Sequence, residues 1–252
     1  AGWIMLFVES GQEALDTVIQ AYKIAEDPEV MTPVMVNLDG FTLTHTYDMV
    51  EVPTQEAIDS YLPAFNTTNK MDMNDPKTLC MSVSPNYHTE ARYLQQQAFE
   101  TAKSKIVVAN ADYAKLTGRS YGDGMIEEYR CEDAEVVLVA MGSVAGTTRT
   151  VIDEMRVRSY RPFPKEYFES IADKFQAVGV IDRSISFGFD GTLFSEVKST
   201  MYGSKAKMAN YIVGLGGRDI PKKMLEDMFN KLFGIASGKN EAEVQFLGMR
   251  WE

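Results

Sequence analysis

The stretch KFQAVGVIDRSISFGFDGTLFSE, residues 174–196, decides the fold class of this chain. Its apolar run at 177–181 predicts a short buried strand, which ends directly in Asp182, Arg183 and Ser184. A turn that contains two glycines follows and leads into an expected helix at 192–201. A strand, a polar turn and a helix in this order are typical of a parallel α/β sheet, where sites and subunit contacts form at the carboxyl ends of the strands.

The same arrangement recurs on both sides of this stretch. An expected strand at 208–213 is followed by GLGGRDI, residues 214–220, which carries Arg218 and Asp219. Upstream, VVLVA at 136–140 is apolar throughout, as parallel strands covered on both faces require, and Gly142 and Ser143 follow it. Further helices are expected at 147–156, 164–175 and 221–236, with a last extended piece at 244–251. Residues 125–252 are therefore predicted to form a parallel α/β domain.

The first half of the chain predicts another α/β unit. WIMLFVE at 3–9 has a strand pattern, and Ser10 with Glu13 forms a capping box that opens a helix. In that helix Leu15, Val18, Ile19, Tyr22 and Ala25 recur at helical spacing and predict its buried face. We also expect a buried strand and turn at 32–40, a short helix at 54–62, a polar loop at 66–77 and a long helix at 87–116. GRSYGDG, residues 118–124, ends the long helix and predicts the domain boundary, before an acidic linker at 126–135.

Bulk composition excludes several classes of protein. The 252 residues carry a formal net charge of −11, which argues against nucleic acid, because a phosphate backbone requires a basic face. No apolar run approaches eighteen residues, so we expect no membrane span. The two cysteines, Cys80 and Cys131, lie far apart and cannot form the closely spaced ligand set of an iron–sulfur or zinc site. Sparse cysteine suits a reducing compartment, and we expect a cytoplasmic protein with no metal ligands of its own.

Five segments, in order along the chain, resemble the alpha subunit of pyruvate:ferredoxin oxidoreductase (pyruvate synthase), a member of the 2-oxoacid:ferredoxin oxidoreductase family. They are NLDGFTLTH (37–45), EDAEVVLVAMGSVAGT (132–147), RSYRPFP (158–164), the stretch at 174–196 and GLGGRDI (214–220). The resemblance implies the C-terminal part of a thiamine-diphosphate-binding domain of the pyrimidine type at 1–124. A transketolase C-terminal-like parallel α/β domain would follow at 125–252.

The resemblance also implies an activity and its partners. Family members oxidatively decarboxylate a 2-oxoacid, here pyruvate, with coenzyme A to give acetyl-CoA and CO2, and they reduce ferredoxin or run in reverse. Thiamine diphosphate and Mg²⁺ would be shared with a partner subunit, and [4Fe–4S] clusters would lie in another subunit. Beta, gamma and delta chains are the expected partners, with two copies of the heteromeric set.

Two departures from the family pattern carry expectations of their own. The residues that would contact the pyrimidine ring and the substrate match nothing here, so the chain is expected to lack an N-terminal part and to hold no catalytic residue. The helix expected to end at Arg156 runs into Val157 without a turn, although such connections usually take about two to six residues. Because family members have an extra strand at this point, we expect residues to be missing between Arg156 and Val157.

The candidate site residues have modest roles in this interpretation. Asp39, Gly40, Phe41 and His45 follow a strand and are the segment expected nearest the active site, although they could simply form a capped turn. Arg183, Ser184, Arg218 and Asp219 lie at strand ends and are candidates for subunit contacts, internal ion pairs or anion binding.

Three alternatives stay open. The chain could be a non-catalytic assembly subunit, could act on 2-oxoisovalerate or 2-oxoglutarate, or could belong to another thiamine enzyme. The motifs RSYRPFP and GLGGRDI argue against the last of these.

Overall fold

The computed structural model describes residues 2–67, 69–80, 82–151 and 154–250. Its helices are α1 (Gly11–Ala25), α2 (Gln55–Tyr61), α3 (Pro85–Thr117), α4 (Val144–Arg149), α5 (Lys165–Ser170), α6 (Thr192–Thr200) and α7 (Lys222–Ala236). Its strands are β1 (Ile4–Phe7), β2 (Val34–Asn37), β3 (Ile126–Tyr129), β4 (Val136–Ala140), β5 (Glu154–Val157), β6 (Ser159–Arg161), β7 (Ala177–Asp182), β8 (Lys207–Ile212) and β9 (Val244–Phe246). A 3-10 turn, η1 (Leu215–Gly217), follows β8.

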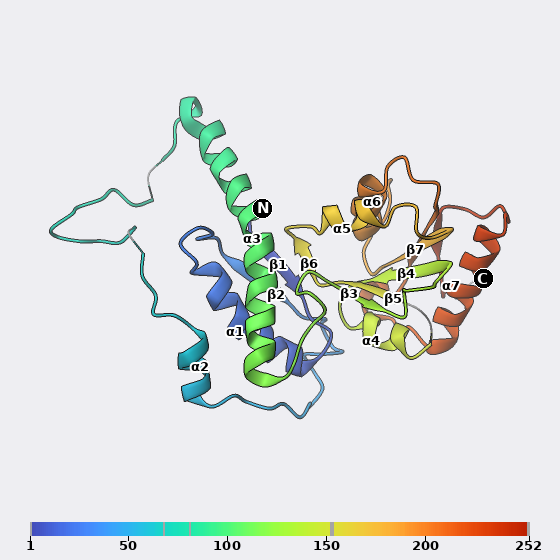
Figure 1. The fold of residues 1–252 in the computed structure, drawn as a ribbon. Helices are drawn as coiled ribbons and strands as arrows, with labels where there is room; N and C mark the ends of the chain where they lie inside the picture. Colours follow the sequence, from blue (N-terminus) through green and yellow to red (C-terminus); the bar gives the residue numbers. More distant parts are fainter. Residues whose placement is uncertain (1, 68, 81, 152–153, 251–252) are drawn as a thin grey trace.

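The second half forms a three-layer α/β/α unit around a six-stranded sheet of order β3-β5-β4-β7-β8-β9. All neighbouring pairs in it are parallel except β3 with β5. Alternate residues of β4 enter different cores: Val136 and Leu138 pack with α4 and α7, whereas Val137 and Val139 pack with α5 and α6. Figure 1 shows these helices on the two faces of the sheet. The prediction of a parallel α/β fold from the apolar strand runs is therefore confirmed.

The first half is built on a three-stranded sheet of order β2-β1-β6, with β1 parallel to β2 and antiparallel to β6. Its core joins Ile4 and Leu6 of β1 to Ile24 of α1 and to Ala102 and Ile106 of α3. Strand β6 belongs to the RSYRPFP motif, so one strand from beyond residue 124 completes the first sheet. The domain boundary itself stays a prediction.

The structure corrects two predictions near the junction of the sheets. The helix expected at 147–156 ends at Arg149, and Glu154–Val157 form strand β5, which pairs with both β3 and β4. Arg156 and Val157 thus lie in one strand, and the expectation that residues are missing between them stays a prediction; residues 152–153 of the expected helix lie outside the described residues. The acidic segment expected as a linker also starts with a strand, because residues 126–129 pair with β5 as the sheet edge. A charged edge strand carries too few apolar residues to be recognised from its pattern.

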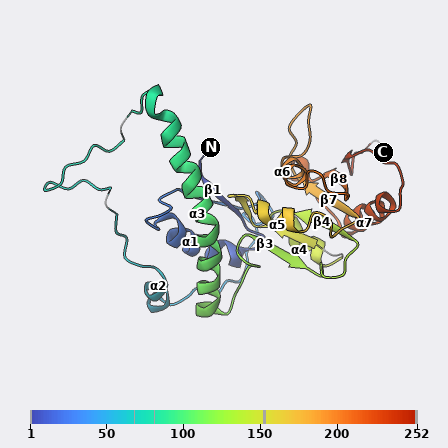
Figure 2. The same cartoon turned by 45° about the horizontal axis from the view of Figure 1, so that its top comes forward.

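Other elements agree with their expected positions to within a few residues, apart from α5, which ends at Ser170 rather than near residue 175, and β9, which ends at Phe246 although an extended piece was expected over 244–251. Helix α3 is long, 33 residues, and its first half extends beyond the sheet, as Figure 2 shows. Among the described residues, no helix combines the length and apolar character required to cross a membrane.

Candidate functional site

Three strand ends from the two sheets meet at one place. Asp39 follows β2 of the first sheet, Ser143 follows β4 and Arg183 follows β7 of the second. The Asp39 carboxylate accepts a hydrogen bond from the Ser143 backbone N–H at 2.6 Å and pairs with the Arg183 guanidinium at 3.0 Å. Arg183 also donates to the Ser143 hydroxyl at 3.4 Å. This cluster of Asp39, Ser143 and Arg183 is called the junction site below.

Two glycines make room for this contact. Gly142 has a φ of +76°, and a Cβ there would stand 3.1 Å from an Asp39 carboxylate oxygen. Gly214 has a φ of +64°, and a Cβ there would stand 3.2 Å from Nε of Arg183. The glycines after β4 and β8 therefore serve close approach as well as left-handed backbone conformation.

A small cavity of about 160 Å³ opens beside the junction site. It is lined by Thr42, Ser143, Val144, Thr147, Arg183, Gly217, Arg218, Asp219 and Ile220. Arg218 reaches across to the Gly248 carbonyl, to which its guanidinium donates at 2.5 Å. The structure thus brings together three of the four charged or polar strand-end candidates, because Arg183 lines the same cavity as Arg218 and Asp219, more than thirty residues further along the chain.

Ser184, the fourth of these candidates, points elsewhere. Its hydroxyl is exposed and hydrogen-bonds to the Thr192 hydroxyl at 2.7 Å. The neighbouring Asp182 is buried and accepts the backbone N–H groups of Leu193 and Phe194, at 2.9 and 3.0 Å, so it caps helix α6. Burial raises the pKa of Asp182, although these hydrogen bonds act to lower it.

The loop after Asp39 presents an exposed pair of rings. Phe41 has a φ of +70° and stacks on His45 with ring centroids 4.6 Å apart. The Thr44 hydroxyl accepts from the Phe41 N–H at 3.0 Å and contacts Nδ1 of His45 at 2.9 Å. A Cβ at Gly40 would meet nothing within 4 Å. Asp39 therefore anchors the loop to the second sheet, and Gly40, Phe41 and His45 lie on the outside of it.

A buried ionic cluster joins helix α1 to strand β5 and the residue that follows it. The Glu13 carboxylate accepts from the Arg156 guanidinium at 2.5 and 3.1 Å and from Nε of Arg158 at 3.0 Å. Arg158 also donates to the Gly124 carbonyl and to the Thr17 hydroxyl, both at 2.8 Å. Both arginines and Glu13 are fully buried. This Glu13–Arg156–Arg158 cluster links helix α1 of the first half to strand β5 of the second sheet.

Asp16, one helical turn further along α1, forms a separate network. It accepts from the Tyr113 and Tyr121 hydroxyls at 2.8 and 2.6 Å and from Nε of Arg119 at 2.7 Å. Burial alone would raise the pKa of Asp16, but the hydrogen bonds from Arg119, Tyr121 and Tyr113 outweigh it and hold this pKa below its usual value.

Glu154 of β5 lies on the edge of the Glu13 cluster with one carboxylate oxygen unpartnered. Its nearest cation is Nε of Arg149, at 3.9 Å. Burial raises the pKa of Glu154 to about 8, although Arg149 and Arg156 act to lower it.

The sequence pattern of α1 did not predict this buried polar layer. It placed Leu15, Val18, Ile19, Tyr22 and Ala25 of α1 inward, whereas the structure buries Glu13, Asp16, Thr17, Gln20 and Ile24. Val18 and Tyr22 are exposed, so the expected buried face was wrong. A signal was available, because the buried polar residues also recur at helical spacing, but polar stripes usually face water.

The described residues do not by themselves fit a complete thiamine diphosphate and Mg²⁺ site. The cavity at the junction site is smaller than the roughly 300 Å³ at which ligand pockets begin. No group of three or more His, Cys, Asp or Glu side chains that could hold a metal ion occurs among the described residues. No reaction step is therefore assigned to a residue of this chain.

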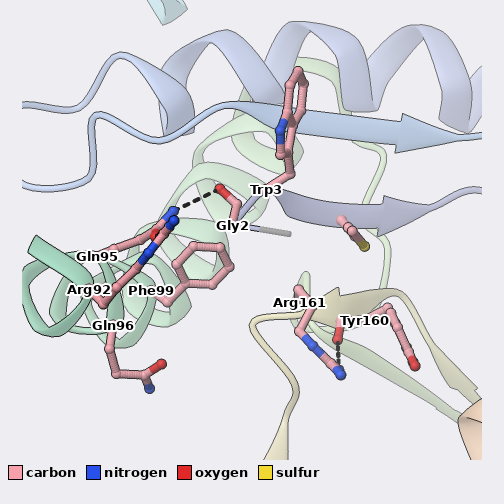
Figure 3. A pocket seen from close by; sticks show the side chains of 9 residues that line it. Gly2, Trp3, Arg92, Gln95, Gln96, Phe99, Tyr160 and Arg161 are labelled. Carbon is pink, nitrogen blue, oxygen red and sulfur yellow. Dashed lines mark hydrogen bonds between the residues drawn. The ribbon is translucent and has the colours of Figure 1, made fainter. Parts of the chain in front are cut away.

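A larger cavity, about 400 Å³, lies at the other end of β1 and is shown in Figure 3. Arg92, Gln95 and Phe99 of α3 line it on one side and Tyr160 and Arg161 on the other. Gln95 donates to the Gly2 carbonyl at 3.3 Å. Arg161 donates to the Tyr160 carbonyl at 2.7 Å and pairs with Glu196, so its charge is already compensated.

Two family models match the chain in the order in which its two halves occur. The model described as pyruvate flavodoxin/ferredoxin oxidoreductase, thiamine diphosphate-binding, matches residues 1–110. The model described as pyruvate:ferredoxin oxidoreductase core domain II matches residues 134–225.

Curated relatives match over the whole length of the chain. Pyruvate synthase subunit PorA of Methanothermobacter thermautotrophicus is 40% identical over 262 residues, which cover 100% of this chain and 66% of that protein. PorA of Pyrococcus abyssi is 37% identical over 100% of this chain and 67% of that protein. Ketoisovalerate oxidoreductase subunit VorA of Pyrococcus furiosus is 39% identical over 96% of this chain and 64% of that protein. The chain thus spans about two thirds of the length of these relatives.

A solved structure shares the fold. The 2-oxoglutarate:ferredoxin oxidoreductase from Magnetococcus marinus, solved with 2-oxoglutarate, coenzyme A and succinyl-CoA, superposes with a TM-score of 0.56 at 14% identity. The match covers 91% of this chain and 42% of that one. With the arrangement of both halves and the identity to the relatives established, the chain belongs to the pyruvate:ferredoxin oxidoreductase family.

Proposed function

We propose that the chain is part of a subunit of an oxidoreductase that converts pyruvate and coenzyme A to acetyl-CoA and CO2. The reaction releases two electrons and one proton, and two ferredoxin molecules each accept one electron; the reverse reaction synthesises pyruvate. The observation that carries the proposal is the 36–41% identity to pyruvate synthase subunit PorA of six organisms.

The proposal includes cofactors that other polypeptide chains must help to bind. Thiamine diphosphate supplies the carbanion chemistry when it is bound, with Mg²⁺ shared with a beta-type subunit. Electrons pass to [4Fe–4S] clusters in another subunit, which is consistent with the two isolated cysteines of this chain. Gamma and delta subunits and ferredoxin complete the proposed set of partners, and the sparse cysteines favour the cytoplasm.

The proposed role of this chain's own residues is positional. Asp39 pairs with Arg183 and so fixes the loop that carries Phe41 and His45 at the carboxyl edge of the sheets. Arg218 and Asp219 are proposed to contact a partner subunit or an anion, because both are exposed on the rim of the cavity beside the junction site. No catalytic residue is proposed within this chain.

The test is a viologen-linked assay of the complex assembled with its partner subunits. We expect reduction that depends on both pyruvate and coenzyme A. The variant Arg218→Ala should weaken assembly or raise the KM for coenzyme A, whereas Lys223→Ala, an exposed residue outside the cavity, should not. A complete complex without pyruvate-dependent reduction would refute the activity and favour a non-catalytic assembly role.

A second candidate substrate is 2-oxoisovalerate. The observation that favours it is the 39% identity to VorA of Pyrococcus furiosus, close to the values for the PorA relatives. The same assay distinguishes the two substrates by the value of kcat/KM for pyruvate divided by the value for 2-oxoisovalerate. A quotient below one would make 2-oxoisovalerate the proposed substrate in place of pyruvate. Measuring 2-oxoglutarate in parallel covers the third family substrate.

A further inference from the structure

The cavity beside the junction site presents side chains that bind phosphate groups. Arg183 and Arg218 line it, together with the hydroxyl-bearing residues Thr42, Ser143 and Thr147. A guanidinium group binds phosphate through two parallel hydrogen bonds, and hydroxyl groups add further donors. The volume of about 160 Å³ is too small for a whole ligand, so only a small anionic group at the end of a ligand can enter.

Both arginines keep donors for such a group. Arg183 contacts Asp39 and Ser143 through the same nitrogen, Nη1, so another edge of its planar fork can bind a second anion. Arg218 is exposed and donates to the carbonyl of Gly248. Among the described residues, no carboxylate pairs with Arg218. Its positive charge is therefore available to a ligand.

An exposed pair of aromatic rings lies next to this cavity. Thr42, which lines the cavity, directly follows Phe41 in the chain. The Phe41 ring stacks on the His45 ring with centroids 4.6 Å apart, and Phe41 is 74% exposed, so the outer face of its ring is open to solvent. Exposed aromatic faces bind flat bases by stacking.

The loop holds this ring in a conformation that a bulky side chain rarely adopts. Phe41 has a φ of +70°, and its N–H donates to the Thr44 hydroxyl at 3.0 Å. Asp39 anchors the start of the loop to Ser143 and Arg183. Strained residues cluster at ligand-binding sites, where the surrounding structure holds them in place. A ring that is fixed before the ligand arrives lowers the entropy cost of binding.

A pocket for phosphate beside an exposed ring matches a nucleotide, which joins a phosphate group to a flat aromatic base. We propose that this face of the chain binds a nucleotide, with its phosphate between Arg183 and Arg218 and its base stacked on Phe41. Free nucleotides such as ADP and the adenosine phosphate end of coenzyme A share this chemistry. Coenzyme A as the source rests on the proposed function, whereas a free nucleotide does not.

The test is isothermal titration calorimetry of the complex assembled with its partner subunits, without 2-oxoacid or ferredoxin, so that no turnover occurs. The probes are ADP, coenzyme A, adenosine and inorganic phosphate. We expect ADP to bind to the wild-type complex. The variant Arg218→Gln should weaken this binding about 10-fold or more, because it removes a charged hydrogen-bond donor to the phosphate.

A second variant separates the two parts of the site. Phe41→Ala should weaken ADP and adenosine about 5-fold or more, the contribution of one stacked base, and should leave inorganic phosphate unchanged. Arg218→Gln should weaken inorganic phosphate and leave adenosine unchanged. Phe187→Ala removes an equally exposed ring outside the site and should change no probe. Because Phe41 and Arg218 are exposed, circular dichroism of the variants should match the wild type.

Asp219 on the rim of the cavity tests the sign of the bound charge. Its carboxylate accepts the Ile220 N–H at 2.9 Å, and its negative charge opposes an anion in the cavity. We expect Asp219→Asn to tighten the binding of inorganic phosphate several-fold. Weaker binding of phosphate in this variant would contradict an anion site.

The probes also identify the source of the nucleotide. If the binding that depends on Arg218 has the same affinity for ADP and coenzyme A to within about threefold, it recognises the nucleotide part that they share. If coenzyme A binds there about 10-fold more tightly than ADP, coenzyme A is the ligand.

Two results would overturn the proposal. One is a wild-type complex that binds no ADP, and the other is ADP binding that both Arg218→Gln and Phe41→Ala leave unchanged. If Arg218→Gln prevents assembly, Phe41→Ala and Asp219→Asn still decide the matter. Failure of the pyruvate assay is a separate result, because a complex that does not turn over pyruvate can still bind ADP.

Discussion

At the scale of single residues, Asp39 and Arg183 form the contact that joins the loop after β2 to the second sheet. Both are partly exposed, so the ion pair contributes modestly to stability, on the order of 0.5–1 kcal/mol. We expect a double-mutant cycle of Asp39→Asn and Arg183→Gln, measured by urea unfolding at low salt, to give a coupling free energy of about this size. A coupling near zero would show that the Asp39 bond to the Ser143 N–H alone holds the loop.

Gly142 offers a sharper test at the same scale. A methyl group there would meet the Asp39 carboxylate, and the backbone φ of +76° is unfavourable for alanine. We expect Gly142→Ala to lower the free energy of unfolding by about 1–2 kcal/mol. Gly146→Ala is the matched control, because a Cβ there meets nothing within 4 Å and helix α4 favours alanine. Equal effects of the two variants on chemical denaturation would refute the close-approach explanation.

At the scale of elements, helix α1 buries its polar side and exposes apolar residues. Glu13 pairs with two fully buried arginines, Arg156 and Arg158. Arg156 also pairs with Glu127 and Glu9, but Arg158 has no other carboxylate partner among the described residues, so removal of the Glu13 charge leaves Arg158 buried without one. We expect Glu13→Gln to lower the free energy of unfolding by about 3 kcal/mol or more. Tyr22→Ser, on the apolar and exposed side, should change it by less than about 0.5 kcal/mol. If Tyr22→Ser lowers the free energy of unfolding more than Glu13→Gln does, in thermal or denaturant unfolding, then α1 buries its apolar side.

Strand β5 carries the pH dependence of this region. The pKa of Glu154 is raised to about 8 in the folded protein from an ordinary value near 4.5. The folded state therefore binds the extra proton, and its stability, complete below pH 4.5, falls as pH rises from there through 8. Glu154→Gln should consequently raise the melting temperature at pH 9 but leave it nearly unchanged at pH 4. If Glu154→Gln changes the melting temperature equally at both pH values, Glu154 is not protonated in the folded protein.

At the scale of the whole molecule, ion pairs between distant segments join the two halves of the chain, such as Glu13 with Arg156 and Asp39 with Arg183. The net charge of −11 makes the molecule repel other acidic proteins.

Much of the fold could be predicted because it depends on local pattern. The apolar runs of β4 and β7, the cap of α1 at Ser10 and the polar turns after the strands are signals within a few neighbouring residues. The ends of α4 and the strand β5 were missed for the converse reason. Arg156 looks like an exposed helix position until carboxylates from α1 and β3 pair with it.

The candidate site was predicted in part for the same reason. Residues after strands of a parallel sheet share an edge, which was enough to select Arg183, Arg218 and Asp219 together. The sequence identified Asp39 as a candidate site residue. It did not predict the ion pair with Arg183, because Arg183 follows a strand of the other sheet. Ser184 shows the limit of the rule, since the neighbour of a site residue along a turn points away from the site.

The sequence by itself determined the α/β class, the positions of most elements and the family, because helix caps, strand runs and motifs depend on residues close together in the chain. Only the tertiary structure decided which side of α1 faces inward, which sheet receives the RSYRPFP strand and where Asp39 finds its cation. These choices depend on contacts between residues more than a hundred positions apart, such as Glu13 with Arg156 and Asp39 with Arg183. A buried charge is stable only with such a distant partner, and no local pattern contains it.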